Sequence, residues 1–213
     1  MKIHQLPGFF IDIEGLDGSG ASTQVRLVAK ELRKLGIKPY LTKEPTKGPI
    51  GKLVRQALER KWNSLPPASV QLLFAADRGR HLNGEVIPRL EKGEMVITDR
   101  YAWASVAFGS VHLSKEWLLE LNRDFILPDL TIFIEVEPEI CLERLAKEKG
   151  GVVLFDEEGH LEQTWDTYHW LASKYWWAQI AVVDGEQEKE KVTQDILQII
   201  LRQPKFKKLK KKT

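Results

Sequence analysis

Nine consecutive residues near the start of the chain have the composition of a loop that binds phosphate. They follow a short apolar run, precede an amphipathic stretch, and read Gly15-Leu16-Asp17-Gly18-Ser19-Gly20-Ala21-Ser22-Thr23. Glycine lets backbone N–H groups turn inward, and the first turn of a helix adds partial positive charge. We therefore expect nucleotide phosphates to bind on Gly15, Gly18, Ser19, Gly20, Ala21, Ser22 and Thr23. The alternative is an ordinary strand-to-helix turn capped by a serine.

The loop departs from the usual pattern G-x-x-x-x-G-K-[ST] at one position, because Ala21 stands where the lysine is expected. That lysine normally offsets the charge on a transferring phosphate. Removing one preorganised transition-state donor costs about 3–4 kcal/mol in other enzymes. Ser22 keeps the hydroxyl that would hold Mg²⁺. The sequence therefore predicts nucleotide binding, with transfer depending on another cation.

Short apolar runs alternate with longer amphipathic stretches along the chain, which is typical of βαβ units and a parallel sheet. We expect strands at residues 9–13, 39–42, 95–98, 130–136 and 180–183. We expect helices at residues 22–35, 50–60, from 66 onward, 138–147, 161–177 and 189–201. This pattern predicts a three-layer α/β sandwich around a five-stranded parallel sheet.

The chain is long enough for one core, and we expect a single domain over residues 1–204. Residues 147–160 hold three glycines and several charges, and they are expected to form a small lid. Residues 205–213 hold six lysines and no acidic residue, and they are expected to be a disordered basic tail.

Composition narrows the classes of function. The formal net charge is +2, so removing the six tail lysines (2 − 6) leaves −4, which does not favour a nucleic-acid-binding surface beyond weak contacts of the tail. No apolar run reaches the roughly 18 residues of a membrane helix. The start of the chain does not have the pattern of a signal peptide. The single cysteine, Cys141, fits a reducing cytoplasm, where we expect the protein.

Several further motifs, in order and at similar spacing, make the chain resemble thymidylate kinases from about residue 9 to about residue 200. Besides the loop, they are Lys43-Glu44-Pro45, Phe74-Ala75-Ala76-Asp77-Arg78 with His81, Asp99-Arg100-Tyr101, Pro128-Asp129-Leu130-Thr131 and Val183-Asp184-Gly185. The resemblance implies a P-loop NTPase-type fold, a homodimer, and transfer of phosphate from ATP-Mg²⁺ to dTMP in pyrimidine deoxynucleotide biosynthesis.

The resemblance also implies residues that bind the acceptor nucleotide. Phe74 would stack on the thymine ring, Arg78 would donate to a base carbonyl, and Ser105 would contact a ring nitrogen, with Phe108 in the same pocket. The alternatives are core packing for Phe74 and plain helix surface for Ser105.

For Arg78, the alternative is a surface ion pair with Asp77 or Glu85.

Residues near the reacting phosphates are implied in the same way. Asp17 would hold the acceptor's sugar hydroxyl, and Asp99 would hold Mg²⁺ together with Ser22. Arg100 would bridge the donor and acceptor phosphates, and Lys43 would meet the acceptor phosphate. Such residues at strand ends lie where open α/β sheets bind ligands. The alternatives are a local cap for Asp17 and a structural ion pair between Asp99 and Arg100.

Three departures from the family pattern bear on activity. Ala21 replaces the loop lysine, Phe108-Gly109 stand where the family has Tyr-Gln, and residues 147–160 contain no arginine. Positive charge at the lid would then come from Arg144, with two nearby lysines. Two other functions therefore remain open, namely a nucleotide-binding paralogue with little transfer activity and a kinase for another nucleoside monophosphate.

Overall fold

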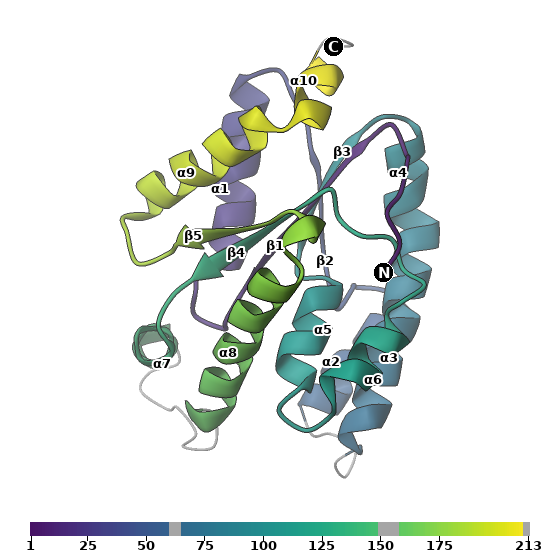
Figure 1. Cartoon of the computed structure of the whole chain (residues 1–213), viewed down its shortest axis with the longest axis vertical. Helices are drawn as coiled ribbons and strands as arrows, with labels where there is room; N and C mark the ends of the chain where they lie inside the picture. Colours follow the sequence, from purple (N-terminus) through teal and green to yellow (C-terminus); the bar gives the residue numbers. More distant parts are fainter. Residues whose placement is uncertain (60–64, 149–157, 211–213) are drawn as a thin grey trace.

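The structure is a computed structural model that describes residues 1–59, 65–148 and 158–210. Its five parallel strands form one sheet in the order β2-β3-β1-β4-β5 (Figure 1). The strands are β1 (Phe9–Gly15), β2 (Tyr40–Lys43), β3 (Met95–Asp99), β4 (Leu130–Glu135) and β5 (Ile180–Asp184). The predicted five-stranded parallel sheet is therefore confirmed.

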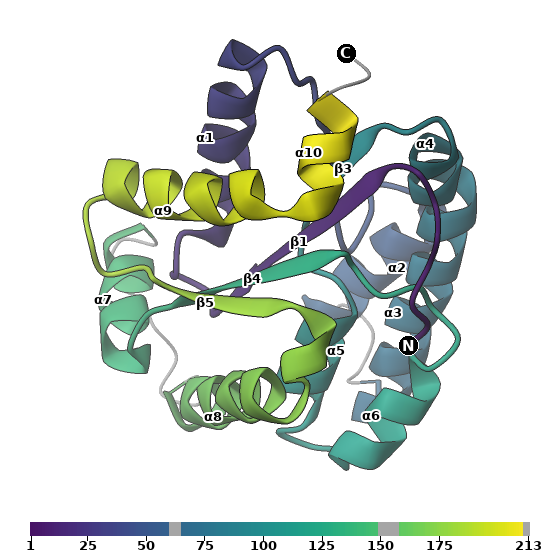
Figure 2. The same ribbon diagram turned by 45° about the horizontal axis from the view of Figure 1, so that its top comes forward.

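Helices cover both faces of this sheet, with α1 and α9 on one face and α5 and α8 on the other (Figures 1 and 2). The described helices are α1 (Ala21–Lys34), α2 (Pro49–Leu58), α3 (Pro67–His81), α4 (Ile87–Glu91), α5 (Ala102–Gly109), α6 (Lys115–Leu121), α7 (Pro138–Glu148), α8 (Glu158–Lys174), α9 (Lys189–Arg202) and α10 (Pro204–Lys210). A π-helical segment, Leu82–Val86, joins α3 to α4. The predicted three-layer arrangement is confirmed.

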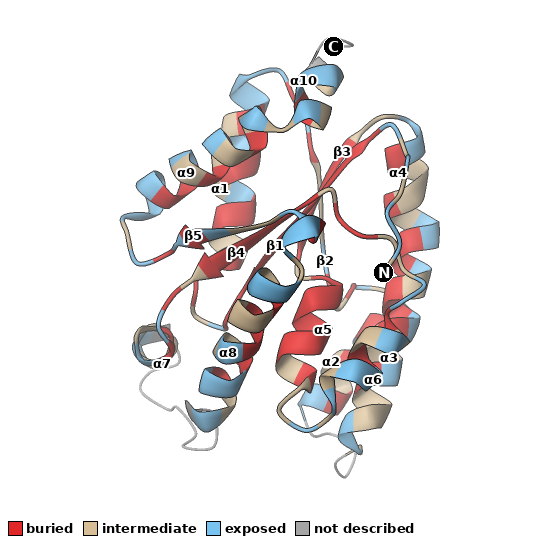
Figure 3. Cartoon of the chain, viewed as in Figure 1, coloured by how far each residue is buried: buried red, intermediate tan, exposed pale blue. Residues whose placement is uncertain are grey.

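The central strand β1 is buried along its whole length and pairs with β3 on one side and β4 on the other. Strands buried on both faces are expected to be rich in β-branched and aromatic residues, and β1 reads FFIDIEG. Figure 3 shows the buried residues concentrated on the central strands and the inward faces of the helices. Asp12 and Glu14 are the exceptions to this apolar pattern, and both are fully buried.

Some helix boundaries differ from the expected ones. The helix expected over residues 161–177 begins at Glu158 and ends at Lys174, and a 3₁₀ turn, Trp176–Ala178, follows it. Helix α5 escaped prediction because seven of its eight residues are buried, so it has no polar face to create a helical period.

The basic tail is more ordered than expected. Residues 204–210 form α10, in which Phe206 is 2% exposed and packs in the main core. Lys205 Nζ lies 2.6 Å from the carboxylate of Asp129. The prediction of a disordered tail is therefore wrong for residues 205–210, because a buried aromatic side chain anchors them.

Most of the expected lid, residues 149–157, lies outside the described residues. The described ends of that segment are helical, since α7 reaches Glu148 and α8 starts at Glu158. Among the described helices, none has the length and apolar character needed to cross a membrane.

Candidate active site

Three strands deliver the candidate residues to one edge of the sheet. β1 ends in the glycine-rich loop, β2 ends at Lys43, and β3 ends at Asp99. Lys43 is the register partner of Asp99, so their side chains leave the sheet on the same side. β1 lies between β3 and β4, and this reversal of strand order is where open α/β sheets form a ligand crevice.

The glycine-rich loop has the backbone geometry of an anion site. Gly18 and Gly20 have φ of 88° and 90°, in the left-handed region that favours glycine. A Cβ atom on Gly18 would lie 2.5 Å from the carbonyl oxygen of Cys141. The first turn of α1 carries no acidic residue, and no side chain caps its N-terminus. Its N–H groups are therefore available to a phosphate.

The side chains of the loop differ in burial and in hydrogen-bond partners. Ser19 is buried, and its Oγ has no hydrogen-bond partner among the described residues. Ala21 is buried in the main core cluster, at the position expected to hold a lysine. Thr23 Oγ1 accepts from Arg26 at 3.2 Å. The loop thus offers backbone groups and the Ser22 hydroxyl to a ligand, but no cation of its own, whereas the Ser19 hydroxyl packs against Gly15.

Ser22, Asp99 and Lys43 form one cluster at the start of α1. Ser22 Oγ donates to Asp99 Oδ2 at 2.5 Å. Lys43 Nζ donates to the same Oδ2 at 2.9 Å and lies 3.2 Å from Ser22 Oγ. Lys43 is more than half exposed, so its ammonium group can turn toward a ligand. The structure therefore places a cation beside the loop that lacks its lysine.

Arg100 connects the loop to the neighbouring pocket. Its Nη2 donates to Asp17 Oδ1 at 2.6 Å, and its guanidinium lies 4.6 Å from the ring centre of Phe108. Burial alone would lower the pKa of Arg100, but the charges of Asp17 and Glu14 outweigh it and raise the pKa. The backbone of Arg100 has φ of 74°, which is costly for a residue with a Cβ atom. Arg100 thus stays charged and held in place.

The structural ion pair between Asp99 and Arg100, which was the alternative to their functional roles, does not form among the described residues. Arg100 pairs with Asp17, whereas Asp99 pairs with Lys43.

Arg144 approaches the loop from α7. Its Nη1 lies 3.5 Å from the carbonyl oxygen of Gly18, and its Nη2 lies 3.3 Å from that of Gly185. It borders the loop on the side opposite to β3, because α7 follows β4. Its position suits contact with the donor nucleotide, as the sequence predicted.

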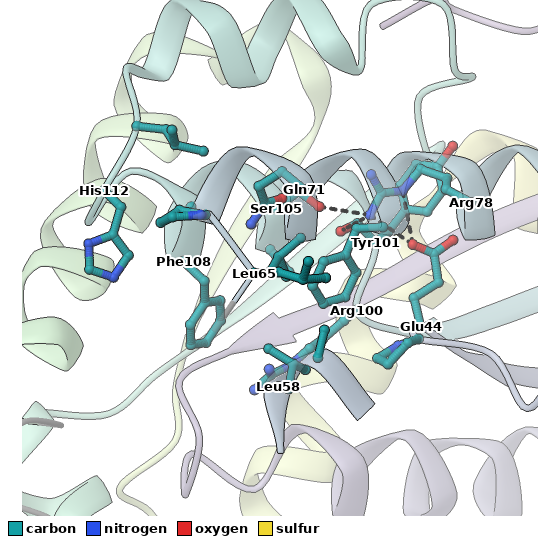
Figure 4. Close-up of a pocket in the computed structure, with 18 of the residues that line it drawn as sticks. Glu44, Leu58, Leu65, Gln71, Arg78, Arg100, Tyr101, Ser105, Phe108 and His112 are labelled. Atoms are coloured by element: carbon teal, nitrogen blue, oxygen red, sulfur yellow. Dashed lines mark hydrogen bonds and ion pairs between the residues drawn. The ribbon is translucent and has the colours of Figure 1, made fainter. Parts of the chain in front are cut away.

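A cavity of about 440 Å³ lies directly beside Asp17 and Arg100. Phe74, Arg78, Ser105 and Phe108, the four predicted base-binding residues, all line it. Figure 4 shows Arg78, Ser105 and Phe108 along it, together with Gln71 and His112. The fold thus brings together residues that lie 34 positions apart in the chain.

Arg78 is 1% exposed and is held by a network of protein groups. Its Nε donates to Glu44 at 2.9 Å, and its Nη2 donates to Tyr101 O and Ser105 Oγ at 3.0 Å each (Figure 4). Its Nη1 donates to Asn122. Such a charge needs full pairing when buried. Arg78 thus forms a buried ion pair with Glu44 at the end of the cavity.

The surface ion pairs considered as alternatives for Arg78 do not form. Asp77 accepts instead from Thr46, at 2.7 Å from both its N–H and its hydroxyl, and Glu85 accepts from Tyr40 at 2.7 Å.

The other two alternatives for the acceptor residues also fail. Phe74 is half-buried and belongs to neither apolar core cluster, and Ser105 is buried rather than on a helix surface. Phe108 packs edge-on against Tyr168 at 6.2 Å and turns its other side to the cavity. An aromatic side chain that faces a cavity from α3 can stack on a planar ligand.

Two carboxyl groups lie beneath this site on β1. Glu14 accepts from the N–H groups of Tyr101 and Ala104 at 3.0 Å and from the Tyr168 hydroxyl at 2.8 Å. Asp12 is fully buried next to Glu14, and no N–H or neutral O–H donor among the described residues pairs with its carboxylate oxygens. Burial and the nearby Glu14 raise the pKa of Asp12 well above its ordinary value. Glu14 therefore holds the start of α5 in place, whereas Asp12 makes no such contact with a backbone N–H group among the described residues.

Comparison with known proteins agrees with this geometry. The profile described as thymidylate kinase matches residues 13–196. The chain is 36% identical over 200 residues to a probable thymidylate kinase of Pyrobaculum aerophilum, covering 93% of this chain and 99% of the relative. It is 34% identical to a probable thymidylate kinase of Pyrococcus abyssi, covering 91% and 96%. The chain belongs to the thymidylate kinase family.

The family resemblance inferred from the motifs is thereby confirmed. In this thymidylate kinase family member, sequence reasoning missed Gln71, Glu44 and Tyr101, which line the cavity. It also missed Asn122, which accepts a hydrogen bond from Arg78. Glu44 and Tyr101 belong to the motifs Lys43-Glu44-Pro45 and Asp99-Arg100-Tyr101, so the sequence did contain a signal for both. The sequence contained no signal for Gln71 or Asn122, because their positions depend on the packing of α3 against α5 and α6.

Proposed function

We propose that this protein transfers the terminal phosphate of ATP to dTMP, giving ADP and dTDP, with Mg²⁺. The observation that carries the proposal is that Asp17 belongs to the phosphate loop and also lines the cavity with Arg100. A donor on the loop and an acceptor in the cavity would therefore meet at one place. Positioning two reactants in this way is the main contribution of phosphoryl-transfer enzymes.

The donor would lie on Gly15, Gly18, Ser19, Gly20, Ala21, Ser22 and Thr23. The left-handed glycines and the uncapped start of α1 support this assignment. Arg144 would contact the same nucleotide from α7.

Ser22 and Asp99 would hold Mg²⁺ together with the phosphates. A hydroxyl and one carboxylate fit this ion, which binds through one or two carboxylates plus substrate phosphates and keeps several waters. The described residues contain no cluster of three or more metal-ligating side chains. This agrees with an ion that arrives with the nucleotide. Bound there, it would neutralise phosphate charge during transfer.

The missing loop lysine leaves a deficit of positive charge that other residues would offset. Lys43 lies at the Ser22–Asp99 cluster and Arg100 lies between the loop and the cavity. Lys43 would move from Asp99 to the acceptor phosphate, and Arg100 would bridge the two phosphates. Two cations already at the junction support transfer, rather than binding alone, as the function.

The acceptor's base would lie in the cavity. Phe74 would stack on it, Phe108 would pack beside it, and Ser105 would reach its polar edge. Arg78 would act mainly by positioning Ser105, because its nitrogens already donate to protein groups. Asp17 would accept from the sugar hydroxyl while it holds Arg100.

We also propose a homodimer located in the cytoplasm. Trp176 is 75% exposed and Trp177 is also exposed, whereas Trp165 and Trp170 pack against the core. Exposed tryptophans are typical of interfaces between subunits. Sedimentation at micromolar concentration tests the dimer.

The activity is tested by measuring transfer from ATP-Mg²⁺ to a panel of nucleoside monophosphates, for the natural protein and for Ala21→Lys. Turnover on dTMP by the natural protein supports the proposal. Tight nucleotide binding without turnover, restored by Ala21→Lys, would instead support a binding protein. A better acceptor than dTMP would reassign the substrate.

A further inference from the structure

Gln71 lines the cavity and carries a buried side-chain amide whose oxygen has no partner among the described residues. The side chain lies on α3 and is 8% exposed. It lines the cavity together with Phe74 and Arg78, and its Oε1 has no hydrogen-bond partner among the described residues (Figure 4). A buried acceptor left unpaired costs about 1–3 kcal/mol, so such groups are commonly satisfied by a ligand or water.

Packing fixes where this amide lies. A Cβ atom on Gly109 would lie 3.0 Å from Gln71 Nε2 and 2.8 Å from a methyl group of Leu118. The amide therefore rests against Gly109, at the end of α5, and glycine there leaves the space that it occupies. Residues Gln71, Phe74 and Arg78 have spacings of three and four, which places them on one face of α3.

Ser105 supplies the complementary group. Its Oγ accepts from Arg78 Nη2 at 3.0 Å, and no acceptor for its own O–H is recorded among the described residues. Ser105 lies one helical turn before Gly109 on α5, on the same face. The cavity wall therefore holds a hydroxyl at Ser105 on α5 and, beside Gly109 one turn further along that helix, the amide of Gln71 from α3.

We propose that Gln71 is a specificity-determining residue whose Oε1 accepts from the N3–H group of a keto-pyrimidine base. Ser105 then donates its O–H to a neighbouring ring carbonyl. Thymine and uracil carry this donor–acceptor pair, whereas cytosine has no N3–H. This inference rests on the proposed function, because it takes the base of the acceptor to lie in this cavity.

The test compares dTMP with its N3-methyl derivative, which lacks the N–H donor, by titration calorimetry. Gln71→Met keeps a similar volume but has no amide. The natural protein should bind dTMP about tenfold more tightly than the derivative, as expected for one hydrogen bond that would otherwise leave a buried group unpaired. Gln71→Met should bind dTMP about tenfold less tightly, and its preference between the two ligands should disappear.

Two controls separate recognition from structure. Gln194→Met, at an exposed position on α9, should leave both affinities unchanged. The melting temperature of unliganded Gln71→Met should be equal to or above that of the natural protein, because the substitution removes an unpaired buried oxygen.

The results that would overturn the role of Gln71 differ from the result that would overturn the proposed kinase activity. Equal discrimination by the natural protein and Gln71→Met would overturn the role of Gln71 while leaving the kinase proposal standing. A lower melting temperature with parallel loss of both ligands would overturn it in favour of a structural role. Failure of the natural protein to bind dTMP would overturn both proposals.

Discussion

The ammonium group of Lys43 lies 2.9 Å from Oδ2 of Asp99, beside a phosphate loop in which Ala21 occupies the lysine position. The two residues are register partners at the ends of β2 and β3, so the sheet itself sets their separation. A cation from a neighbouring strand thus stands next to the loop that lacks one. This relationship makes the role of Lys43 directly testable.

Lys43→Met should lower kcat for dTMP phosphorylation by about 100-fold or more, as for loss of one preorganised donor to the transition state. Adding Ala21→Lys should restore part of the loss, because a loop lysine would again neutralise phosphate charge. Steady-state kinetics at saturating ATP-Mg²⁺ measure both. Lys38→Met, an exposed position just before β2, serves as the matched control and should retain full activity. A loss of less than threefold in Lys43→Met would remove Lys43 from the catalytic residues.

Glu44→Gln should destabilise the protein by about 3–5 kcal/mol, the usual cost of leaving a buried charge without its partner. Glu44 accepts from Arg78 and lies 3.0 Å from Nδ1 of the buried His81. Because Arg78 also donates to Ser105, the affinity for dTMP should fall as well. Urea denaturation measures the first effect and calorimetry the second. Unchanged stability would mean that Arg78 finds another acceptor.

Asp12→Val should stabilise the protein by about 1–3 kcal/mol at pH 8, since it removes from a strand a buried carboxyl that lies beside a second carboxyl and pairs with no N–H donor among the described residues. The pKa of Asp12 is raised above its ordinary value of 3.8, by burial first and by Glu14 second. Because the folded state favours the protonated form of Asp12, the stability that this residue contributes is complete below pH 3.8. That stability is lost as the pH rises through the folded-state pKa. The gain from Asp12→Val should therefore be larger at pH 8 than at pH 5.

Asp12→Asn is the control for charge, because it keeps the polar shape without ionising. It should flatten the dependence of unfolding free energy on pH above 5, as measured by urea denaturation across that range. A steep dependence that persists in both variants would assign it to Glu14, whose pKa burial also raises.

Phe206→Ala should destabilise the protein by about 3 kcal/mol, the lower end of the range for truncating a buried phenylalanine. The side chain belongs to the main core even though it follows the last residues of α9. Thermal or urea unfolding measures the change. Lys207→Ala, exposed on the same helix, should stay within about 0.5 kcal/mol of the natural protein. Equal stability of the two variants would show that α10 contributes nothing to folding.

The sheet and the phosphate loop were predictable because their signals are local. Strands such as Met95–Asp99 begin with a short apolar run flanked by charged residues, and Gly18 and Gly20 stand where the backbone needs positive φ. The buried helix α5 gave no such signal, because a helix that is apolar on nearly all sides has no amphipathic period. The tail was predicted to be disordered because its composition is dominated by six lysines, and a composition does not reveal that one aromatic side chain, Phe206, is buried in the core.

The sequence by itself determined the order of strands and helices, the backbone of the phosphate loop and the absence of its lysine, because each depends on residues adjacent in the chain. Only the tertiary structure decided the partners. It paired Lys43 with Asp99, Arg100 with Asp17 and Arg78 with Glu44, and it placed Gln71 in the wall of the cavity. These choices depend on strand register and helix packing between distant segments, which no local pattern of residue types encodes.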